Sequence, residues 1–322
     1  MQNSRTMDDC FDLTLNIPAK LNLFFEVIRR LSTGFHEIES LVTPISIHDT
    51  LRVKPSAGLN FSVKISPEEK FQRLFAGKTI PTDDSNLVMR AVYRLKESLP
   101  QRRDLPGADI ILTKRIPSEA GMGGGSSDAA GALLLLNEFW NAGLSRDALA
   151  KIGAEIGSDV PLFLKGFPVI CRGCGEILEP VAGGETFPTL HFVVVKPPTG
   201  CSTPAVYRLC EPQGPQNSGV IQRMIDAWRE NDLETFAEGL KNRLMAPALQ
   251  VAPDVRKVLE TLGRVPVPLA GFSMTGSGSA CFGLCRTHEE ALKNAEFLEK
   301  NCAGTVFTAE SELAPLQILR TG

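Results

Sequence analysis

Apolar residues alternate with polar ones, or run together, through the first part of the chain, and both patterns are typical of β-strands. Turn-forming residues interrupt the pattern at Gly34 and in the segment from Pro55 to Gly58. We therefore expect an N-terminal sheet, with strands at residues 11–16, 21–28, 38–53, 59–65 and 107–117.

Helical periodicity first appears near residue 85. Apolar residues recur on one face of the segment 85–99, and Ser85 is suited to cap it. The segment 129–140 is apolar on nearly every side, which predicts a buried helix. The segment 144–157 follows the same rules for a helix, with Ser145 as its expected cap.

The character of the chain changes beyond residue 172. The Gly- and Pro-rich segment 166–188 separates the first elements from a second set. We expect this second set to contain helices at 219–232, 233–244, 253–263 and 289–301, and strands at 190–198, 270–285 (with a turn) and 305–310. Together, these expected helices and strands indicate an α+β protein of two halves, residues 1–172 and 173–322, with a cleft between them.

Composition narrows the class of protein. The 322 residues suffice for two ordinary domains, and 43% apolar and 22% charged residues are typical of globular proteins. A net charge of −3 argues against nucleic acid as a partner, and no apolar run is long enough to span a membrane. The opening residues resemble neither a secretory signal nor a transit peptide, so we expect a location in the bacterial cytoplasm.

The eight cysteines are scattered along the chain, which favours reduced thiols over a disulfide framework. Cys171 and Cys174 have the spacing C-x-x-C, which occurs in zinc and redox sites. A zinc site needs two more ligands at comparable spacing, and a redox pair is expected where a helix begins. Gly173 and Gly175 indicate a turn instead, so we favour a structural role for the pair.

The segment KRIPSEAGMGGGSSDAAGALLLLN spans residues 114–137. Between a predicted strand and a predicted helix it carries Gly121, Gly123, Gly124 and Gly125, followed by Ser126 and Ser127. Glycines are costly to order, so a plain structural turn and a binding site both have to be considered. Backbone N–H groups near a helix N-terminus form an anion site, and Lys114 adds a full positive charge. Neither G-x-x-x-x-G-K-[ST] nor G-x-G-x-x-G is present.

Two further segments accompany this loop, PAKLNLF at 18–24 and MTGSGSACFGL at 274–284. The three together resemble the signature motifs of the galactokinase–homoserine kinase–mevalonate kinase–phosphomevalonate kinase superfamily. Within it, PAKLNLFFEV, GFHEIES, GMGGGSSDAAGALLLLN and IGSDVPLFL resemble the family of 4-diphosphocytidyl-2-C-methyl-D-erythritol kinases, of the non-mevalonate isoprenoid pathway. The resemblance covers most of the chain and is densest before residue 175.

This resemblance implies an N-terminal half like the second domain of ribosomal protein S5, with a left-handed βαβ crossover, and a ferredoxin-like C-terminal half. The active site is expected in the cleft between them. The implied reaction transfers a phosphoryl group from ATP, with Mg²⁺, to the 2-hydroxyl of a small-molecule substrate, cytidine diphosphate-linked methylerythritol. A monomer or weak homodimer is expected, with neither a nucleic acid nor a membrane as partner.

The resemblance places Asp159 beside the acceptor hydroxyl, with Lys20 next to it. Phosphoryl transfer needs groups held in line and negative charge stabilised, so an orienting base and a cation suit the task. Lys20 would also keep Asp159 ionised. Without the resemblance, Asp159 equally suits a helix cap and Lys20 a solvated strand end.

For the substrate, the resemblance implies that His36 grips the cytosine between the rings of Phe35 and Tyr207. Phe35 stands where the family commonly has tyrosine, so a hydroxyl contact is lost. Taken alone, the two aromatic residues suit ordinary packing and His36 suits a turn. The other implied substrate contacts are Asn22, Thr203 and Pro204 at the methylerythritol part, and Gly276, Ser277 and Gly278 at the diphosphate or the transferring group.

For the nucleotide, the resemblance places Asn86 and Lys114 near the adenine and ribose. Mg²⁺ is expected to be held mostly by phosphates and water, and we assign no protein ligand to it. The phosphates are expected in the loop of Gly121, Met122, Gly123, Gly124, Gly125, Ser126 and Ser127.

Two alternatives stay open. One is another kinase of the superfamily, acting on mevalonate, homoserine or a sugar, and GFHEIES and the triple glycine argue against it. The other is a non-catalytic relative that only binds nucleotide, and the presence of Lys20, Asp159 and the loop serines argues against that.

Overall fold

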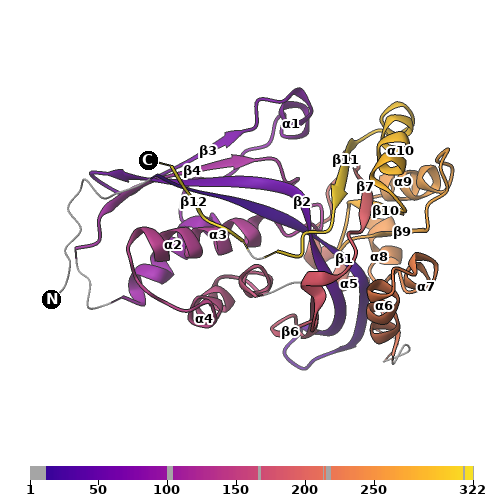
Figure 1. The fold of residues 1–322 in the computed structure, drawn as a ribbon, viewed down its shortest axis with the longest axis horizontal. Helices are drawn as coiled ribbons and strands as arrows, with labels where there is room; N and C mark the ends of the chain where they lie inside the picture. The colour runs from indigo at the N-terminus through magenta and orange to yellow at the C-terminus, as the bar shows by residue number, and fades with distance from the viewer. Residues whose placement is uncertain are drawn as a thin grey trace.

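The computed structural model describes residues 12–99, 104–165, 168–212, 214, 219–314 and 316–321. Its elements form two halves, each a sheet with helices packed on it (Figure 1). The α+β class and the two-half arrangement are therefore confirmed. The boundary expected between residues 172 and 173 falls within strand β5 (Val169–Gly173) and stays a prediction. The opening residues, on which the expected location rests, and Cys10 lie outside the described residues.

The N-terminal half is built on an eight-stranded sheet. Besides β5, its strands are β1 (Asp12–Arg30), β2 (His36–Ser56), β3 (Asn60–Ile65), β4 (Gly107–Lys114), β6 (Ile177–Pro180), β8 (Lys241–Asn242) and β12 (Leu319–Thr321). Five of them follow the order β12–β1–β2–β4–β3, while β5 pairs with β2 and β6, and β8 pairs with β1. The pairs β3–β4 and β1–β8 are parallel and the others antiparallel.

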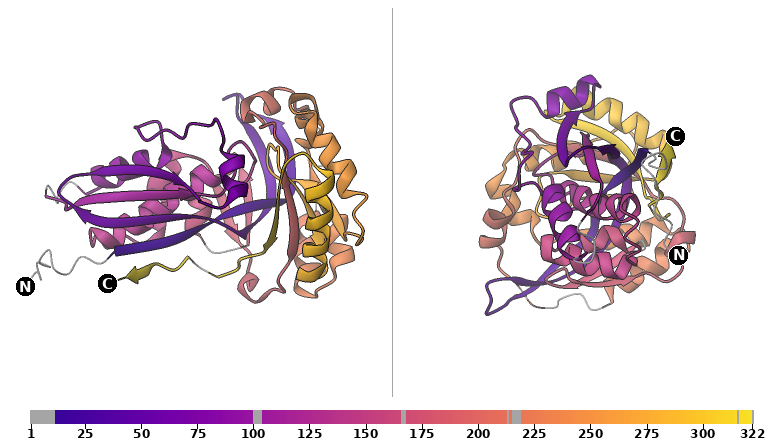
Figure 2. Two further views of the ribbon diagram at one scale, coloured as in Figure 1. Left: turned by 90° about the horizontal axis from the view of Figure 1, so that it is seen from above. Right: turned by 90° about the vertical axis from the view of Figure 1, so that its left-hand side faces the viewer.

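Three helices of the N-terminal half, α2 (Leu87–Glu97), α3 (Gly124–Phe139) and α4 (Arg146–Ile156), pack together below its sheet in the view of Figure 1. Helix α3 contacts β1 and β2, and α2 and α4 lie beside it (Figures 1 and 2). Most of α3 is buried, as its apolar sequence predicts. Shorter helical segments are α1 (Glu69–Leu74), η2 (Pro161–Leu164) and η3 (Gly184–Thr186).

Caps explain where two of these helices begin. Ser145 caps α4 as predicted, because its hydroxyl oxygen accepts a hydrogen bond from the backbone N–H of Ala148. The prediction of Ser85 as the cap of α2 is wrong. Asn86 is the cap, with its side-chain oxygen 2.9 Å from the backbone nitrogen of Val88, while the Ser85 hydroxyl donates to Asp83.

The C-terminal half is built on a four-stranded antiparallel sheet. Its strands, in spatial order, are β11 (Thr305–Glu310), β7 (His191–Lys196), β10 (Cys281–Cys285) and β9 (Gly271–Met274). Its helices are α5 (Thr203–Arg208), α6 (Val220–Arg229), α7 (Leu233–Glu238), α8 (Met245–Val251), α9 (Asp254–Leu262) and α10 (His288–Asn301). The helix expected at 233–244 ends earlier, since residues 241–242 form β8 against β1.

Three buried apolar clusters form the core, and β1 and β2 contribute to each of them. From β1, Leu15 belongs to the first cluster, Leu21 to the second and Val27 to the third. The two halves therefore share their longest strands. No helix among the described residues is long and apolar enough to cross a membrane.

Candidate active site

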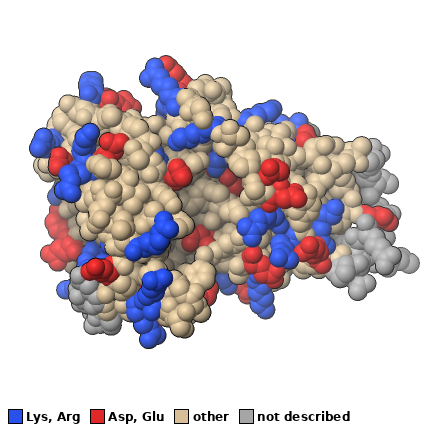
Figure 3. Space-filling model, turned by 180° about the vertical axis from the view of Figure 1, so that it is seen from behind, with Lys and Arg blue, Asp and Glu red and all other residues tan. Residues whose placement is uncertain are grey.

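A cleft of about 830 Å³ gathers most of the predicted site residues, a volume within the usual range for small-molecule sites. The space-filling view shows the molecule hollowed near its middle (Figure 3). The predicted residues that line the cleft are Lys20, Asn22, Phe35, His36, Gly121, Met122, Gly123, Gly124, Gly125, Ser126, Asp159, Thr203, Pro204, Tyr207, Gly276 and Ser277. Asn86, Lys114, Ser127 and Gly278 do not contribute to its lining.

Lys20 lies on β1, buried at the bottom of the cleft, and connects the first motif to the glycine loop. Its ammonium group donates to the backbone oxygen of Gly121 at 2.6 Å and to the side-chain oxygen of Asn22. Its backbone N–H donates to Met122 at 3.0 Å. Burial lowers the pKa of Lys20, and the nearby negative charge of Asp159 opposes that effect.

Asn22 is held in place by groups from three elements. Its backbone N–H donates to the Thr275 hydroxyl at 3.0 Å, and its side-chain nitrogen donates to the Ser40 hydroxyl at 2.8 Å. Ser40 in turn donates to the backbone oxygen of Phe24 at 2.6 Å. These bonds fix the amide so that its oxygen faces Lys20. Sequence reasoning identified Asn22 but missed Ser40 and Thr275, which act through it.

The glycine loop leads into α3, and its glycines serve close contacts between backbones. Gly123 caps the helix with a positive φ of 73°, so no side chain covers the first N–H groups. Gly121 also has a positive φ, of 72°, and a Cβ there would lie 2.2 Å from the backbone oxygen of Thr275. The loop thus exposes an N-terminal helix end to the cleft and packs against the third motif.

The third motif is the turn between β9 and β10. Asn242 holds it by donating to the backbone oxygens of Met274 and Gly276, at 2.7 and 2.8 Å. The Ser277 hydroxyl lies 2.8 Å from the Thr203 hydroxyl, which connects this turn to α5. The segment is therefore more than the plain hairpin turn that G-S-G also suits. Asn242, isolated in the sequence from any motif, was not predicted.

Lys114 is buried and forms ion pairs with two aspartates behind the glycine loop. Its ammonium group lies 2.7 Å from a carboxylate oxygen of Asp128 and also contacts Asp49. Burial alone would lower the pKa of Lys114, but the two carboxylates raise it overall. Asp49 also accepts from the backbone N–H of Ile116 at 2.9 Å. The positive charge of Lys114 is thus compensated inside the protein.

Asn86 and Ser127 are also engaged within the chain. The side-chain nitrogen of Asn86 donates to Pro81 at 2.7 Å, while its oxygen caps α2. The Ser127 hydroxyl, which is fully buried, donates to the backbone oxygen of Pro18 at 2.7 Å and so connects α3 to β1. Ser126 lines the cleft and is the loop serine with access to a ligand.

Asp159 lies in the turn between α4 and η2, where its exposed side chain lines the cleft. The cap of η2 is Val160, and that helix has no side-chain cap bond. The cap role that the sequence also allowed for Asp159 is therefore wrong. Its carboxylate acts on the charge of Lys20 instead.

Aromatic rings from two segments also line the cleft. The ring centroids of His36 and Tyr207 are 5.0 Å apart, with an interplanar angle of 38°. Phe35 lines the cleft with 65% of its surface exposed, so it is not packed into the core. Burial lowers the pKa of His36, and Arg30 adds to the effect, which favours the neutral imidazole.

Cys171 and Cys174 both line the cleft, and all cysteines of the described residues are free. Burial raises the pKa of Cys171 to about 12, so it stays a thiol. The one group of potential metal ligands found in the described part of the chain contains no cysteine. The structural role of the pair stays a prediction.

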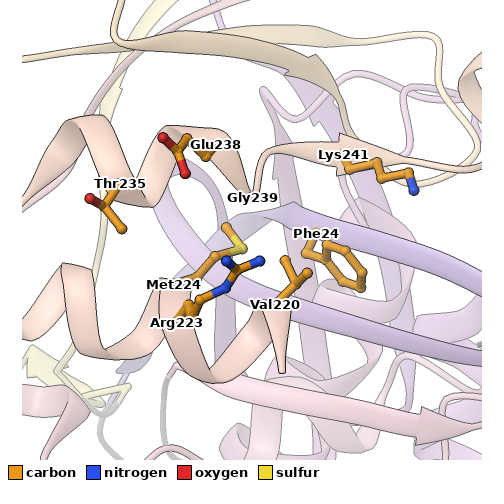
Figure 4. Close-up of a pocket in the computed structure, with 8 residues that line it drawn as sticks. All are labelled: Phe24, Val220, Arg223, Met224, Thr235, Glu238, Gly239 and Lys241. Carbon is orange, nitrogen blue, oxygen red and sulfur yellow. The ribbon is translucent and has the colours of Figure 1, made fainter. Parts of the chain in front are cut away.

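A second cavity, of about 160 Å³, lies between β1, α6 and α7 (Figure 4). Phe24, Met224 and Gly239 contribute to its wall, and a Cβ on Gly239 would lie 2.3 Å from Met224. It contains none of the predicted site residues. Its volume is too small for a nucleotide.

Comparisons with known proteins identify the family of the chain. The GHMP kinases N terminal domain matches residues 86–167, and the GHMP kinases C terminal domain matches residues 224–304. A relative from Nocardia farcinica (strain IFM 10152), named 4-diphosphocytidyl-2-C-methyl-D-erythritol kinase, is 35% identical over 94% of each chain. A relative of the same name from Verminephrobacter eiseniae (strain EF01-2) is 38% identical over 83% of this chain and 84% of its own.

Solved structures give the same result. A crystal structure of 4-(cytidine 5'-diphospho)-2C-methyl-D-erythritol kinase superposes with a TM-score of 0.73 at 31% identity, covering 93% of this chain and 99% of that one. A homoserine kinase from Cytophaga hutchinsonii has the same TM-score at 16% identity, and this shows the fold alone. Since relatives above 30% identity match almost end to end, this chain belongs to the 4-diphosphocytidyl-2-C-methyl-D-erythritol kinase family.

Proposed function

We propose that this chain transfers the γ-phosphoryl group of ATP to the 2-hydroxyl of 4-diphosphocytidyl-2-C-methyl-D-erythritol, giving the 2-phosphate and ADP. One observation carries the proposal. A single cleft contains the Lys20–Asp159 pair, the glycine loop at the start of α3, and the His36–Tyr207 ring pair. The pair suits a reacting hydroxyl and the glycine loop suits a polyphosphate. The rings suit a nucleobase such as cytosine.

In the proposed reaction Asp159 accepts a hydrogen bond from the substrate hydroxyl. This bond orients the hydroxyl oxygen of the substrate toward the γ-phosphorus of ATP. A bond forms between that oxygen and phosphorus, and the bond to the β–γ bridging oxygen breaks, so ADP leaves with the electron pair. A tertiary alcohol is far less acidic than a carboxylic acid, so its proton passes to Asp159 late. Lys20 stabilises the charge on the transferring group.

The start of α3 supports binding of the ATP phosphates. Its first N–H groups face the cleft without a covering side chain, and the Ser126 hydroxyl lies beside them. Oxygen donors are the ligands that Mg²⁺ prefers, so Ser126 would join the phosphates and water in holding the ion. We propose that Lys114 supports this loop from behind, near the nucleotide, with Asn86 beside it at the start of α2.

The remaining contacts are assigned to two parts of the substrate, the methylerythritol and the diphosphate. We place the methylerythritol part against Asn22, Thr203 and Pro204, and the diphosphate near the third-motif turn. We propose a monomer or a weak homodimer as the working form.

Replacing Tyr207 with alanine is expected to raise the KM for the cytidyl substrate about 5- to 150-fold, since stacking on an aromatic ring contributes about 1–3 kcal/mol per base. The kcat should change less, because the ring is assigned to the cytosine and not to the reacting hydroxyl. Steady-state kinetics at saturating ATP measures both. Tyr207→Phe keeps the ring and should stay near wild type, as should Tyr93→Ala on the outer face of α2. An unchanged KM in Tyr207→Ala would remove the ring from the site.

The proposed function is tested by ADP release from Mg·ATP with four separate acceptors, namely the cytidyl substrate, mevalonate, homoserine and galactose. We expect turnover with the first alone. Turnover with another acceptor would keep the kinase and refute the cytosine site. Folded protein that binds ATP but is silent with all four would contradict the proposal as a whole.

A further inference from the structure

Three metal-ligating side chains meet at one end of the C-terminal sheet, and none of them lines the active-site cleft. His191 begins β7, and Glu310 ends β11 directly opposite it in the antiparallel register. His288 begins α10, which packs on both strands (Figure 1). Residues far apart in sequence are thus brought together by three separate elements.

Distances within this group suit a metal ion. Nδ1 of His191 lies 3.2 Å, and Nδ1 of His288 3.0 Å, from the same carboxylate oxygen, Oε1 of Glu310. All three ligand atoms lie within 4.8 Å of one another. Ligand atoms in a tetrahedral zinc site, with bonds of about 2.0–2.1 Å, are roughly 3.3 Å apart. The two measured distances are already close to this value.

The surroundings of the two imidazoles also suit ligation. Nδ1 of His191 is buried and makes no hydrogen bond of acceptable geometry, despite its distance to Glu310. His288 is the first residue of α10, so its side chain projects from the start of that helix. Its side chain is 55% exposed, so a rotation can bring it onto the ion.

We propose that His191, His288 and Glu310 bind one Zn²⁺ ion, with water in the remaining position. Two imidazoles and a carboxylate are a set that zinc takes and that Mg²⁺, which prefers oxygen ligands, does not. The ion would connect β7, β11 and α10. It is separate from the Mg²⁺ that accompanies ATP.

Equilibrium dialysis of the folded chain against Zn²⁺, with Mg²⁺ in excess, tests this proposal. We expect one tightly bound zinc ion per chain in the wild type. His288→Ala and Glu310→Gln should each weaken that binding at least about tenfold, as loss of a ligand requires. Both side chains are partly exposed, and circular dichroism checks that the variants are folded.

His48→Ala is the matched control. His48 forms a comparable pair with Glu312, at 2.8 Å, but belongs to no three-ligand group in the described part of the chain. Its zinc binding should equal that of the wild type. Thermal unfolding gives an independent readout, because a ligand of the folded state raises Tm. Zinc should raise it by a few degrees in wild type and His48→Ala, but not in His288→Ala.

Two outcomes would overturn the proposal. One is a wild-type chain that binds no stoichiometric zinc. The other is zinc binding that survives unchanged in both His288→Ala and Glu310→Gln, which would assign the ion to other groups, such as the free cysteines.

Discussion

Replacing Asp159 with asparagine is expected to lower kcat by about a hundredfold or more, which corresponds to about 2.7 kcal/mol in the transition state. Asparagine keeps the size of the side chain but loses the charge that accepts the hydroxyl proton and faces Lys20. The fold should remain intact, because Asp159 caps no helix and its side chain is exposed to the cleft. Steady-state turnover with the cytidyl substrate is the measurement.

Asp147→Asn supplies the control for Asp159. Asp147 is an exposed carboxylate in α4, the helix that precedes the turn of Asp159. Its ion pair with Lys165, at 2.5 Å, lies outside the cleft. Loss of that surface pair costs little, so turnover should stay near wild type. Near-normal turnover in Asp159→Asn would remove Asp159 from the mechanism.

Replacing Lys20 with alanine is expected to reduce kcat by at least about a hundredfold as well, because the transferring group loses its nearest buried cation. Alanine also leaves a space beside Gly123, whose added Cβ would lie 3.2 Å from the Lys20 side chain. Lys20→Met fills that space without a charge, and it should be as inactive as alanine. Lys165→Ala, on the surface, is the matched control.

Lys20 and Asp159 should behave as a unit. The double variant is expected to be little slower than either single variant, since each residue acts on the same transition state. Burial lowers the pKa of Lys20, so in the wild type kcat should begin to fall at a pH below the ordinary range of lysine. Asp159 opposes that shift, so in Asp159→Asn the fall should move to still lower pH. Additive losses and an unmoved pH profile would show two independent roles.

Local sequence patterns predicted the long elements well. The apolar run at residues 129–140 and the Ser145 cap both have causes within a few residues, and both are found in the structure. The cap of α2 was misplaced by one residue because Ser85 and Asn86 are both good caps. The overlong helix prediction at 233–244 failed because a distant strand, β1, pairs with residues 241–242.

The residues of the candidate site show the same difference between local patterns and contacts with distant residues. Residues inside the three motifs could be identified, and most of them line one cleft. Ser40, Asn242 and Asp49 could not, because each acts through a partner far away in the sequence and none stands in a recognisable pattern. Nor does the sequence reveal that the charge of Lys114 is compensated by two aspartates, since this depends on burial.

The sharing of β1 and β2 among all three apolar clusters has a consequence for unfolding. Neither half keeps a complete hydrophobic interior if these two strands are removed, so the halves cannot melt one after the other. We therefore expect denaturation to be cooperative over both halves, with a single free energy of unfolding.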